Sequence, residues 1–363
     1  MTSLIETPNE IELTYVAIYK LHGLSALPDS AVNLDFVALS NPSLKAVLTI
    51  DPEPYLKDID KAAAIGTQLL KGVFAPENSG TFEERLAAEI AEVKRVRGTS
   101  RGVFAVLKGE LQVPTPEFKA RRDTDEFGVS LDDVSKDEIR GKFQQSVQAV
   151  LTGLSLSLPE GTDRGFEKAG EVMFLTETGN TKPIFILNFR MGGMRGSVAR
   201  PLTTEIAAEA KDLATRLKSE ASSRAYSLLR TSLDRKTDGL QGFIAAWSAL
   251  EIFINGTFKS TYEARWFQIM EEGAPASSKP VFVRFADVMK DKYRLADKFL
   301  IIVSMLDAIG AEADEKEFRR LKKVRDELLH ALDVPPGPLP TEAVQRLLLK
   351  FMKLHLGVSL VEG

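Results

Sequence analysis

The chain has 363 residues, above the length at which one hydrophobic core usually stops growing, so two domains are expected. Hydrophobic residues make up 44% and charged residues 27%, an ordinary globular mixture that argues against wholesale disorder. The absence of cysteine excludes disulfides, thiolate metal sites and cysteine nucleophiles. A formal net charge of −4 excludes a bulk polycation, so any nucleic-acid contact has to come from a local patch.

The first residues, M-T-S-L-I-E-T-P-N-E, lack the basic start and the apolar core of a signal peptide. The strongest apolar run, residues 299–306, is far shorter than the roughly 20 residues that span a bilayer. We therefore expect a cytoplasmic protein that does not enter a membrane. With only 3 histidines, a histidine-rich metal site is not expected, and no motif indicates a cofactor.

Residues 1–200 mix strand and helix patterns without regular alternation. Period-two apolar patterns predict strands at residues 11–19, 103–107, 171–175 and 184–189. The last two flank the turn-rich segment T-E-T-G-N-T-K-P, which predicts a hairpin. Helices are predicted at residues 57–71, 81–97 and 136–154, and Thr81 with Glu84 forms a capping-box pattern. The combination predicts an α+β domain over residues 1–200.

Near residue 200 the glycine-rich segment M-G-G-M-R-G-S-V-A-R-P is typical of a linker and lacks the spacing of a P-loop. Beyond it the pattern is helical nearly throughout. Helices are predicted at residues 203–234, 239–258, 260–272, 281–290, 294–309, 312–332 and 341–356. We therefore expect an all-α helical bundle over residues 201–363.

The predicted helix at 312–332 carries an unusual arginine. Its apolar stripe consists of Phe318, Leu321, Val324, Leu328 and Leu332. Arg325 lies within the edge of this stripe, where a charge has to be paired or to reach a polar pocket.

Asp326 and His330 are four residues apart on another face of the same helix, so the carboxylate can orient the imidazole. Arg319, Lys322 and Lys323 share this flank, which indicates a local positive site able to hold a phosphodiester. Charged helix faces are, however, usually only solvated, and a histidine near a helix C-terminus gains stability from the helix dipole without any catalytic role.

The predicted helix at 239–258 carries the opposite charge. Glu251 lies within its apolar stripe, beside Trp247, and needs a partner there. Arg325 and Arg224 are the two candidates. A buried ion pair that fixes the register of two helices and a direct role in a site both remain open for Glu251.

These segments resemble a known family. F-I-A-A-W-S-A-L-E-I-F-I followed by V-R-D-E-L-L-H is similar to the Apea-like branch of the HEPN superfamily, over about 150 of the 363 residues. Such domains carry a W-x-x-L-E segment and then R-x(4–6)-H, with a polar residue after the arginine. The matching positions are Trp247, Leu250 and Glu251, then Arg325, Asp326 and His330.

The resemblance implies a helical bundle that forms a homodimer and brings two R-x(4–6)-H motifs into one cleft. It implies a metal-independent endoribonuclease of a bacterial defence or stress system, with RNA as the partner. His330 then acts as general acid or base, Arg325 stabilises charge on the phosphoryl oxygens, and Asp326 orients His330 or holds the pocket. Other members are inactive modules that bind RNA, nucleotide or protein, and a purely structural dimerisation domain is the remaining alternative.

Residues 1–200 contain no nucleophile elbow, no H-E-x-x-H and no dinucleotide fingerprint. We expect His22 to be a structural or surface residue, since no partner ligands lie near it in the sequence. The N-terminal domain is therefore expected to be an accessory or sensing domain, on which a protein partner or trigger could act.

Overall fold

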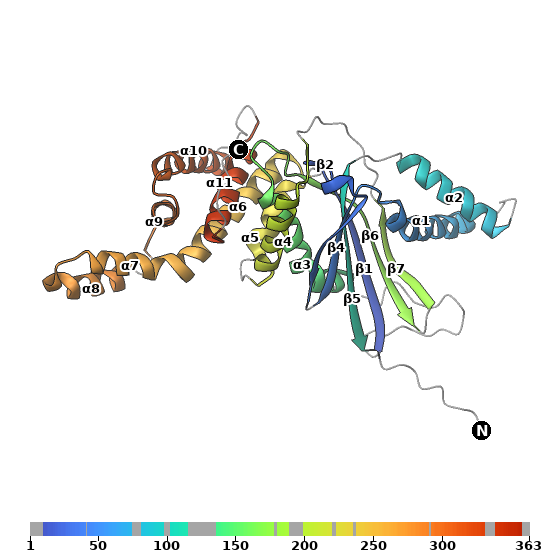
Figure 1. The fold of residues 1–363 in the computed structure, drawn as a ribbon, viewed down its shortest axis with the longest axis horizontal. Helices are drawn as coiled ribbons and strands as arrows, with labels where there is room; N and C mark the ends of the chain where they lie inside the picture. The colour runs from blue at the N-terminus through green and yellow to red at the C-terminus, as the bar shows by residue number, and fades with distance from the viewer. Residues whose placement is uncertain are drawn as a thin grey trace, which may run out of the picture. The chain divides into compact units, whose positions relative to one another are not determined.

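The computed structural model describes residues 10–40, 42–74, 81–97, 102–114, 136–177, 180–188, 199–219, 223–234, 237–289, 292–330 and 338–357. The chain divides into two compact units, Met1–Lys218 (unit 1) and Ser219–Gly363 (unit 2). Unit 1 contains an antiparallel sheet with helices and unit 2 is helical, which confirms the predicted order of an α+β part and a helical part (Figure 1). None of the described helices is long and apolar enough to cross a membrane.

The elements of unit 1 follow in chain order. They are β1 (Glu10–Leu21), β2 (Leu24–Ala26), β3 (Asn33–Leu39), β4 (Ser43–Thr49), α1 (Glu53–Phe74), α2 (Phe82–Arg97), β5 (Val103–Pro114), α3 (Lys136–Ser157), β6 (Phe166–Glu177), β7 (Asn180–Asn188), β8 (Arg200–Pro201) and α4 (Thr204–Ser219). The main sheet has the order β3-β4-β5-β1-β6-β7, and β2 pairs with β8. All four predicted strands and all three predicted helices are present, and β6 and β7 form the predicted hairpin. Strands β2, β3, β4 and β8 were not predicted.

The helix α4 groups with unit 1, whereas the sequence-based division at residue 200 assigns it to the second domain. Gly153 shows why α4 is tied to α3. A Cβ atom at this glycine would lie 2.8 Å from the carbonyl oxygen of Ala210 and 2.8 Å from the amide nitrogen of Ala214. The two helix backbones are therefore in direct contact, which any larger side chain would prevent.

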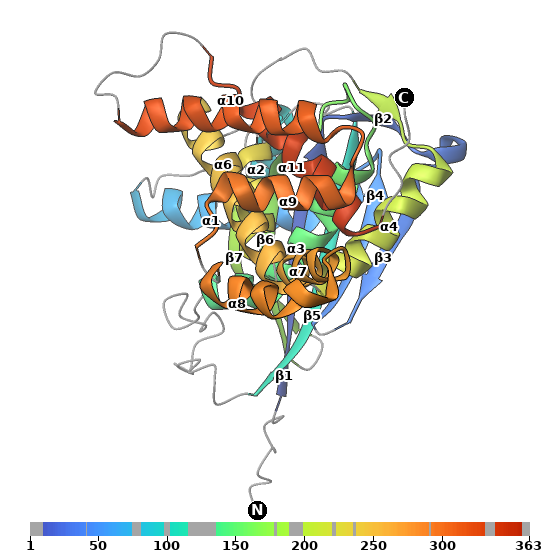
Figure 2. The same cartoon turned by 90° about the vertical axis from the view of Figure 1, so that its left-hand side faces the viewer.

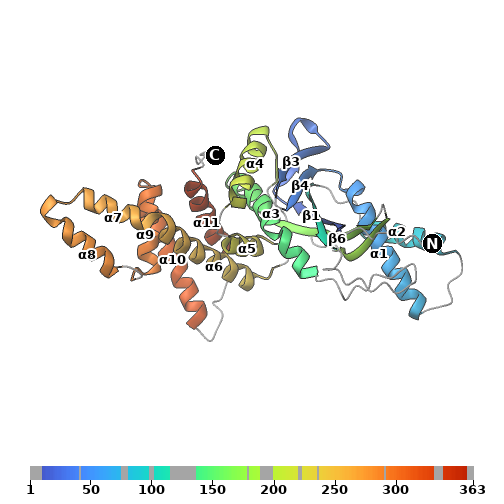
Figure 3. The ribbon, with the colours of Figure 1, turned by 90° about the horizontal axis from the view of Figure 1, so that it is seen from below.

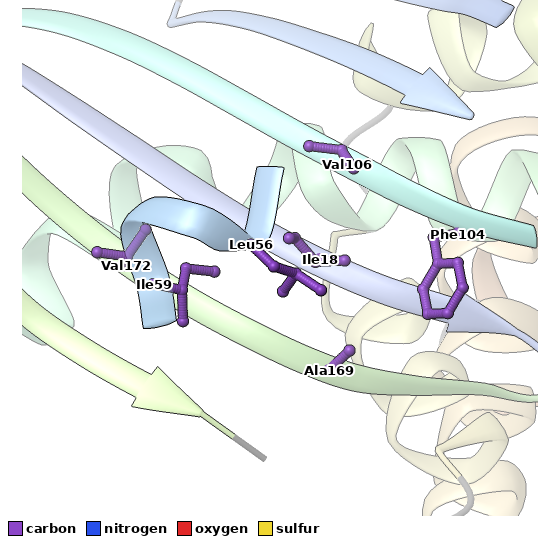
Figure 4. Packing of buried hydrophobic residues seen from close by; sticks show 7 residues of the cluster. All are labelled: Ile18, Leu56, Ile59, Phe104, Val106, Ala169 and Val172. Carbon is purple, nitrogen blue, oxygen red and sulfur yellow. The ribbon is translucent and has the colours of Figure 1, made fainter. Parts of the chain in front are cut away.

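One face of the sheet is covered by α1. Leu56 and Ile59 of this helix are buried against apolar side chains of the three central strands (Figure 4). The strand residues in the cluster are Ile18, Phe104, Val106, Ala169 and Val172. The neighbouring α2 begins as predicted, because the Thr81 amide donates to Glu84 and the Glu84 amide donates to the Thr81 hydroxyl.

The helix α3 packs against the opposite face of the same sheet. Its Phe143 ring stacks on Tyr15 of β1, with a centroid distance of 5.1 Å. The ring occupies the space above Gly109 of β5, where a Cβ atom would lie 2.3 Å from it. Helices therefore cover both faces, which explains why β1 is buried on both sides.

A buried carboxylate lies on the α3 face. Glu171 of β6 is fully buried and accepts hydrogen bonds from Tyr15 Oη at 2.9 Å and from Arg140 Nε of α3 at 3.0 Å. Lys168 is its third donor. Lys168 and Glu171 are three residues apart and would face opposite sides of a regular strand. A β-bulge at Ala169 shifts the alternation, so both side chains reach the α3 face.

Burial alone would raise the pKa of Glu171, because it disfavours the charged form. The charge and hydrogen bond of Lys168, with the hydrogen bonds of Arg140 and Tyr15, outweigh burial and hold the pKa below its ordinary value. Glu171 is therefore ionised in the folded protein and stabilises it at neutral pH.

Unit 2 consists of seven α-helices among the described residues. They are α5 (Ser223–Leu233), α6 (Gly239–Thr257), α7 (Glu263–Glu272), α8 (Lys279–Met289), α9 (Leu295–Leu306), α10 (Ala311–His330) and α11 (Thr341–His355). The helix predicted at 203–234 is represented by α4 and α5, and residues 220–222 between them lie outside the described residues.

An aromatic core holds four helices of unit 2 together. Phe299 of α9 stacks on Phe318 of α10 with a centroid distance of 4.3 Å. Phe318 also stacks on Trp247 of α6, and Phe299 meets Phe351 of α11 edge to face. Figure 2 shows α9 next to α10, as their contacts require. This core positions one face of α10 against α6.

The helix α6 continues into α7 through a π-helical segment, Phe258–Tyr262. Such a segment inserts one extra residue and rotates the side chains that follow. Here Tyr262 Oη lies 2.9 Å from Nδ1 of His355 at the end of α11. The segment thereby ties the base of α7 to the rest of the unit.

We predict that Glu171→Gln lowers the free energy of unfolding of unit 1 by about 2 kcal/mol at pH 7, because it removes a buried charge that three donors surround. Hydrogen exchange in increasing urea, read on peptides from β1 and β6, measures the change. Glu92→Gln, which breaks an exposed pair with Arg95 on α2, should leave it within about 0.5 kcal/mol.

The parent protein and the Glu171→Gln variant should also differ in how their free energy of unfolding depends on pH. The folded pKa of Glu171 is lowered, so its contribution is complete above the unfolded value near ~4.3 and is lost as the pH falls through the folded value. The stabilities of the parent and of Glu171→Gln should therefore converge in acid. If the difference in stability between the parent and Glu171→Gln stayed constant from pH 7 to acid, Glu171 would not be ionised in the folded protein.

Candidate functional site

The helix α6 supplies the acidic half of the candidate site. It begins after Asp238, whose side chain accepts a hydrogen bond from the amide of Gln241 and caps the helix. Most of the apolar residues of α6 are buried, among them Trp247 and Leu250. Glu251 follows on the edge of this buried surface, and its side chain is 28% exposed. The sequence placed Glu251 within the apolar stripe of this helix, and the structure places it at the edge of that stripe.

The helix α10 supplies the basic half. Arg325 is also 28% exposed, and its Nη2 lies 2.7 Å from Oε1 of Glu251. Of the two partners considered for Glu251, the structure pairs it with Arg325, whereas Arg224 is exposed on α5. A guanidinium held this way keeps a fixed direction while part of it still faces water.

The Trp247 ring lies against the guanidinium of Arg325. The Cζ atom of Arg325 lies 5.8 Å from the centre of the Trp247 ring, within the range of a cation–π contact. The indole is 2% exposed and stacks on Phe318 of the aromatic core. Within the described part of the chain its N–H has no hydrogen-bond partner. Trp247 thus links the candidate site to the packing of the unit.

Asp326 is the second carboxylate on Arg325. Its Oδ1 accepts from Arg325 Nη1 at 2.8 Å, and its Oδ2 accepts from Lys322, one turn earlier. The hydrogen bond from Lys322 lowers the pKa of Asp326, burial acts in the opposite direction, and the bond from Arg325 lowers it further. The four charges of Glu251, Arg325, Asp326 and Lys322 therefore form one balanced cluster.

The expected positive flank of α10 is neutralised along its length. Arg319 pairs with Glu315 at 2.6 Å and Lys323 lies 3.7 Å from Glu327. Arg320, to which the sequence assigned no role, pairs with Glu317. These are opposite charges at three- and four-residue spacing, a pattern that is present in the sequence and that predicts ion pairs along the helix. Phosphate binding on α10 therefore cannot rest on bulk positive charge.

His330 is the last residue of α10, and its side chain lies outside the described residues. On a helix, five residues separate the backbones of Arg325 and His330 by about 7.5 Å along the axis. Both partners of Asp326 named above are cations of α10, so the orientation of His330 by Asp326 stays a prediction. Residue Leu332 of the predicted stripe also lies outside the described residues.

Two further features bear on the chemistry. His355, to which the sequence assigned no role, is bonded to Tyr262 and meets Phe253 edge to face.

Across the residues described in both units, no group of three or more His, Asp or Glu side chains is placed to hold a metal ion. His22 of unit 1 lies 3.6 Å from Glu167, and both side chains are largely buried.

We predict a coupling energy of about 1–2 kcal/mol between Glu251 and Arg325 in a double-mutant cycle with alanine, because a half-buried charge-assisted pair exceeds an exposed one. Urea unfolding followed by tryptophan fluorescence measures it, since both tryptophans lie in unit 2. The Lys323–Glu327 pair, with side chains 75% and 55% exposed, is the matched control and should give less than about 0.5 kcal/mol. Equal coupling in both cycles would show that burial of the first pair is unimportant.

The comparisons with known proteins give no relative. No family model matches the chain, and no curated protein and no solved structure is similar to it. The resemblance to the Apea-like HEPN family therefore rests on the residues quoted from the sequence. The geometry around Arg325 is an independent observation, made on this chain alone.

Proposed function

We propose that unit 2 is an endoribonuclease domain of the Apea-like HEPN type, which cleaves RNA without a metal ion. The observation that carries the proposal is the fixed, partly exposed guanidinium of Arg325. It is held by Glu251 and Asp326 and supported by Trp247, one and a half turns before His330 on the same helix.

The guanidinium keeps free donors in this arrangement. Arginine has five N–H groups, and the two contacts to carboxylates use one at Nη1 and one at Nη2. The rest can meet the non-bridging oxygens of a phosphodiester. Because the side chain is already immobilised by its partners, little conformational entropy is lost when the substrate binds.

In the proposed reaction the 2′-hydroxyl of the substrate attacks the adjacent phosphorus, and the 5′-oxygen of the next nucleotide leaves. His330 removes the proton of the hydroxyl or supplies one to the leaving oxygen, as histidine side chains do in general acid–base catalysis. Arg325 stabilises the negative charge that develops on the phosphoryl oxygens. DNA lacks the 2′-hydroxyl and is not a substrate.

The balanced charge of α10 favours a second candidate, a module that binds RNA, nucleotide or protein without turnover. Each of its five cations from Arg319 to Arg325 has a carboxylate partner. A purely structural role of the same pairs predicts neither cleavage nor binding. Unit 1 is, in this proposal, the accessory or sensing part.

We predict that the purified chain cleaves RNA in EDTA and spares DNA of the same sequence. Arg325→Ala and His330→Ala should slow cleavage by roughly 100-fold or more, because each removes a group that acts on the transition state. Arg320→Ala removes a cation of the same helix that pairs with Glu317 and should cleave at the parent rate. Gel analysis of labelled RNA measures all four rates.

Two outcomes decide between the candidates. A parent that binds labelled RNA but never cuts it, with binding lost in Arg325→Ala, establishes the non-catalytic module. A parent that cuts, with Arg325→Ala and His330→Ala cutting equally fast, contradicts the assignment of the site.

We further predict a graded role for Glu251 as a positioning residue. Glu251→Gln keeps one hydrogen-bond acceptor for Arg325 and should retain more activity than Glu251→Ala, which leaves the guanidinium unheld. The measurement is the cleavage rate at saturating RNA, with unfolding in urea as the control for stability. Equal activity of the two variants would show that Glu251 does not position Arg325.

A further inference from the structure

The carboxylate of Asp326 is shared between two cations of α10. Its Oδ1 accepts from Arg325 Nη1 at 2.8 Å, and its Oδ2 accepts from Lys322 Nζ at 2.5 Å. Figure 3 shows α10 crossing α6, whose Glu251 holds the same guanidinium. One stretch of α10 therefore carries a fixed pair of cations, with Arg325 as one member and Lys322 as the other.

Lys322 differs from three neighbouring cations of α10 in its exposure and in the donors that it keeps. Its side chain is 38% exposed, whereas Arg319, Arg320 and Lys323 are 62%, 52% and 75% exposed. Arg319 and Arg320 each direct two guanidinium nitrogens at a single glutamate. An ammonium has three N–H donors, and among the described residues Lys322 uses one of them, on Asp326. The other two donors of Lys322 can meet a ligand.

The sharing of Asp326 also lets Lys322 turn toward a ligand at little cost. A carboxylate that loses its cation in a half-buried place is destabilised, because it keeps the cost of leaving water. If the ammonium of Lys322 turns away, Asp326 still has the hydrogen bond from Arg325 Nη1. No carboxylate of the cluster is then left without a cation.

The spacing of the two cations suits neighbouring phosphates of one strand. Residues three apart on a helix are separated by about 4.5 Å along the axis and by about 60° around it. The phosphates of one strand follow one another at about 3.4 Å of rise when the bases are stacked, and farther apart in an extended single strand. Arg325 and Lys322 can therefore meet two successive phosphates.

We propose that Lys322 binds the phosphate next to the scissile one, so that the preferred substrate is an RNA strand longer than a dinucleotide. The inference rests on the proposed function, in which Arg325 meets the scissile phosphate. Lys322 touches no reacting atom in this arrangement. It therefore acts on binding, lowering KM and leaving kcat unchanged.

Binding of a labelled 2′-O-methyl RNA tests this contact without turnover, because a methylated 2′-oxygen cannot attack the phosphorus. Lys322→Gln should flatten the slope of log Kd against log salt by about 0.7, the share of one phosphate contact on a single strand. Arg320→Gln is the matched control: it removes a cation on the opposite side of α10 and should keep the parent slope. Fluorescence anisotropy over a range of salt measures these slopes.

Short substrates separate the neighbouring phosphate from the scissile one. A dinucleoside monophosphate contains the scissile phosphate alone, and Lys322→Gln should cut it as fast as the parent does. A terminal phosphate added at its 5′ or its 3′ end supplies the second anion. In the parent and in Arg320→Gln, one of these additions should lower KM about tenfold at unchanged kcat, and Lys322→Gln should lose this gain.

A conservative variant excludes a loss of fold as the cause. Lys322→Arg keeps the positive charge and should restore both the salt slope and the gain from the terminal phosphate. Circular dichroism verifies that all variants keep the helix content of the parent.

The outcomes differ from those of the ribonuclease proposal. If Lys322→Gln keeps the parent slope, or gains from the terminal phosphate as the parent does, the subsite is overturned and cleavage through Arg325 and His330 stands. A parent that binds the 2′-O-methyl RNA through Lys322 but never cuts RNA supports the subsite and overturns the catalytic role. A parent that neither binds nor cuts RNA overturns both.

Discussion

Each unit of this protein contains a carboxylate that is partly or fully removed from water and is paired with an arginine of a neighbouring helix. In unit 1 it is Glu171, which β6 places under α3, where Arg140 meets it. In unit 2 it is Glu251 of α6, which Arg325 of α10 meets. The two differ in exposure: Glu171 is fully buried, whereas the Glu251 side chain is 28% exposed. The first pair can therefore only stabilise the fold, while the second can also meet a ligand.

This difference explains why the candidate site lies in the helical unit. Arg325 is bound tightly enough to keep its direction and is open enough to offer donors to a phosphate. The aromatic core beneath it, Trp247 on Phe318 on Phe299, keeps α6 and α10 in register. Stability and the proposed chemistry therefore use the same contact between two helices.

Much of this was visible in the sequence. Periodicity located nearly every helix, and the place of Glu251 in an apolar stripe indicated a cationic partner, for which Arg325 and Arg224 were the two candidates. The strands β3 and β4 were not predicted, although each has seven residues and is longer than three of the four predicted strands. The neutral flank of α10 was missed because each cation was considered without the carboxylate one turn away.

The bulge at Ala169 constrains how β6 can vary in length. The bulge adds one residue to β6, so side chains before and after it alternate between the two faces in opposite order. Lys168 and Glu171 lie on the same face only because of this extra residue. A substitution at Ala169 preserves this count, whereas a deletion of one residue turns Lys168 to the α1 side. Related chains can therefore replace Ala169 by another side chain that fits the buried cluster with Leu56, but should keep the number of residues between the two charges.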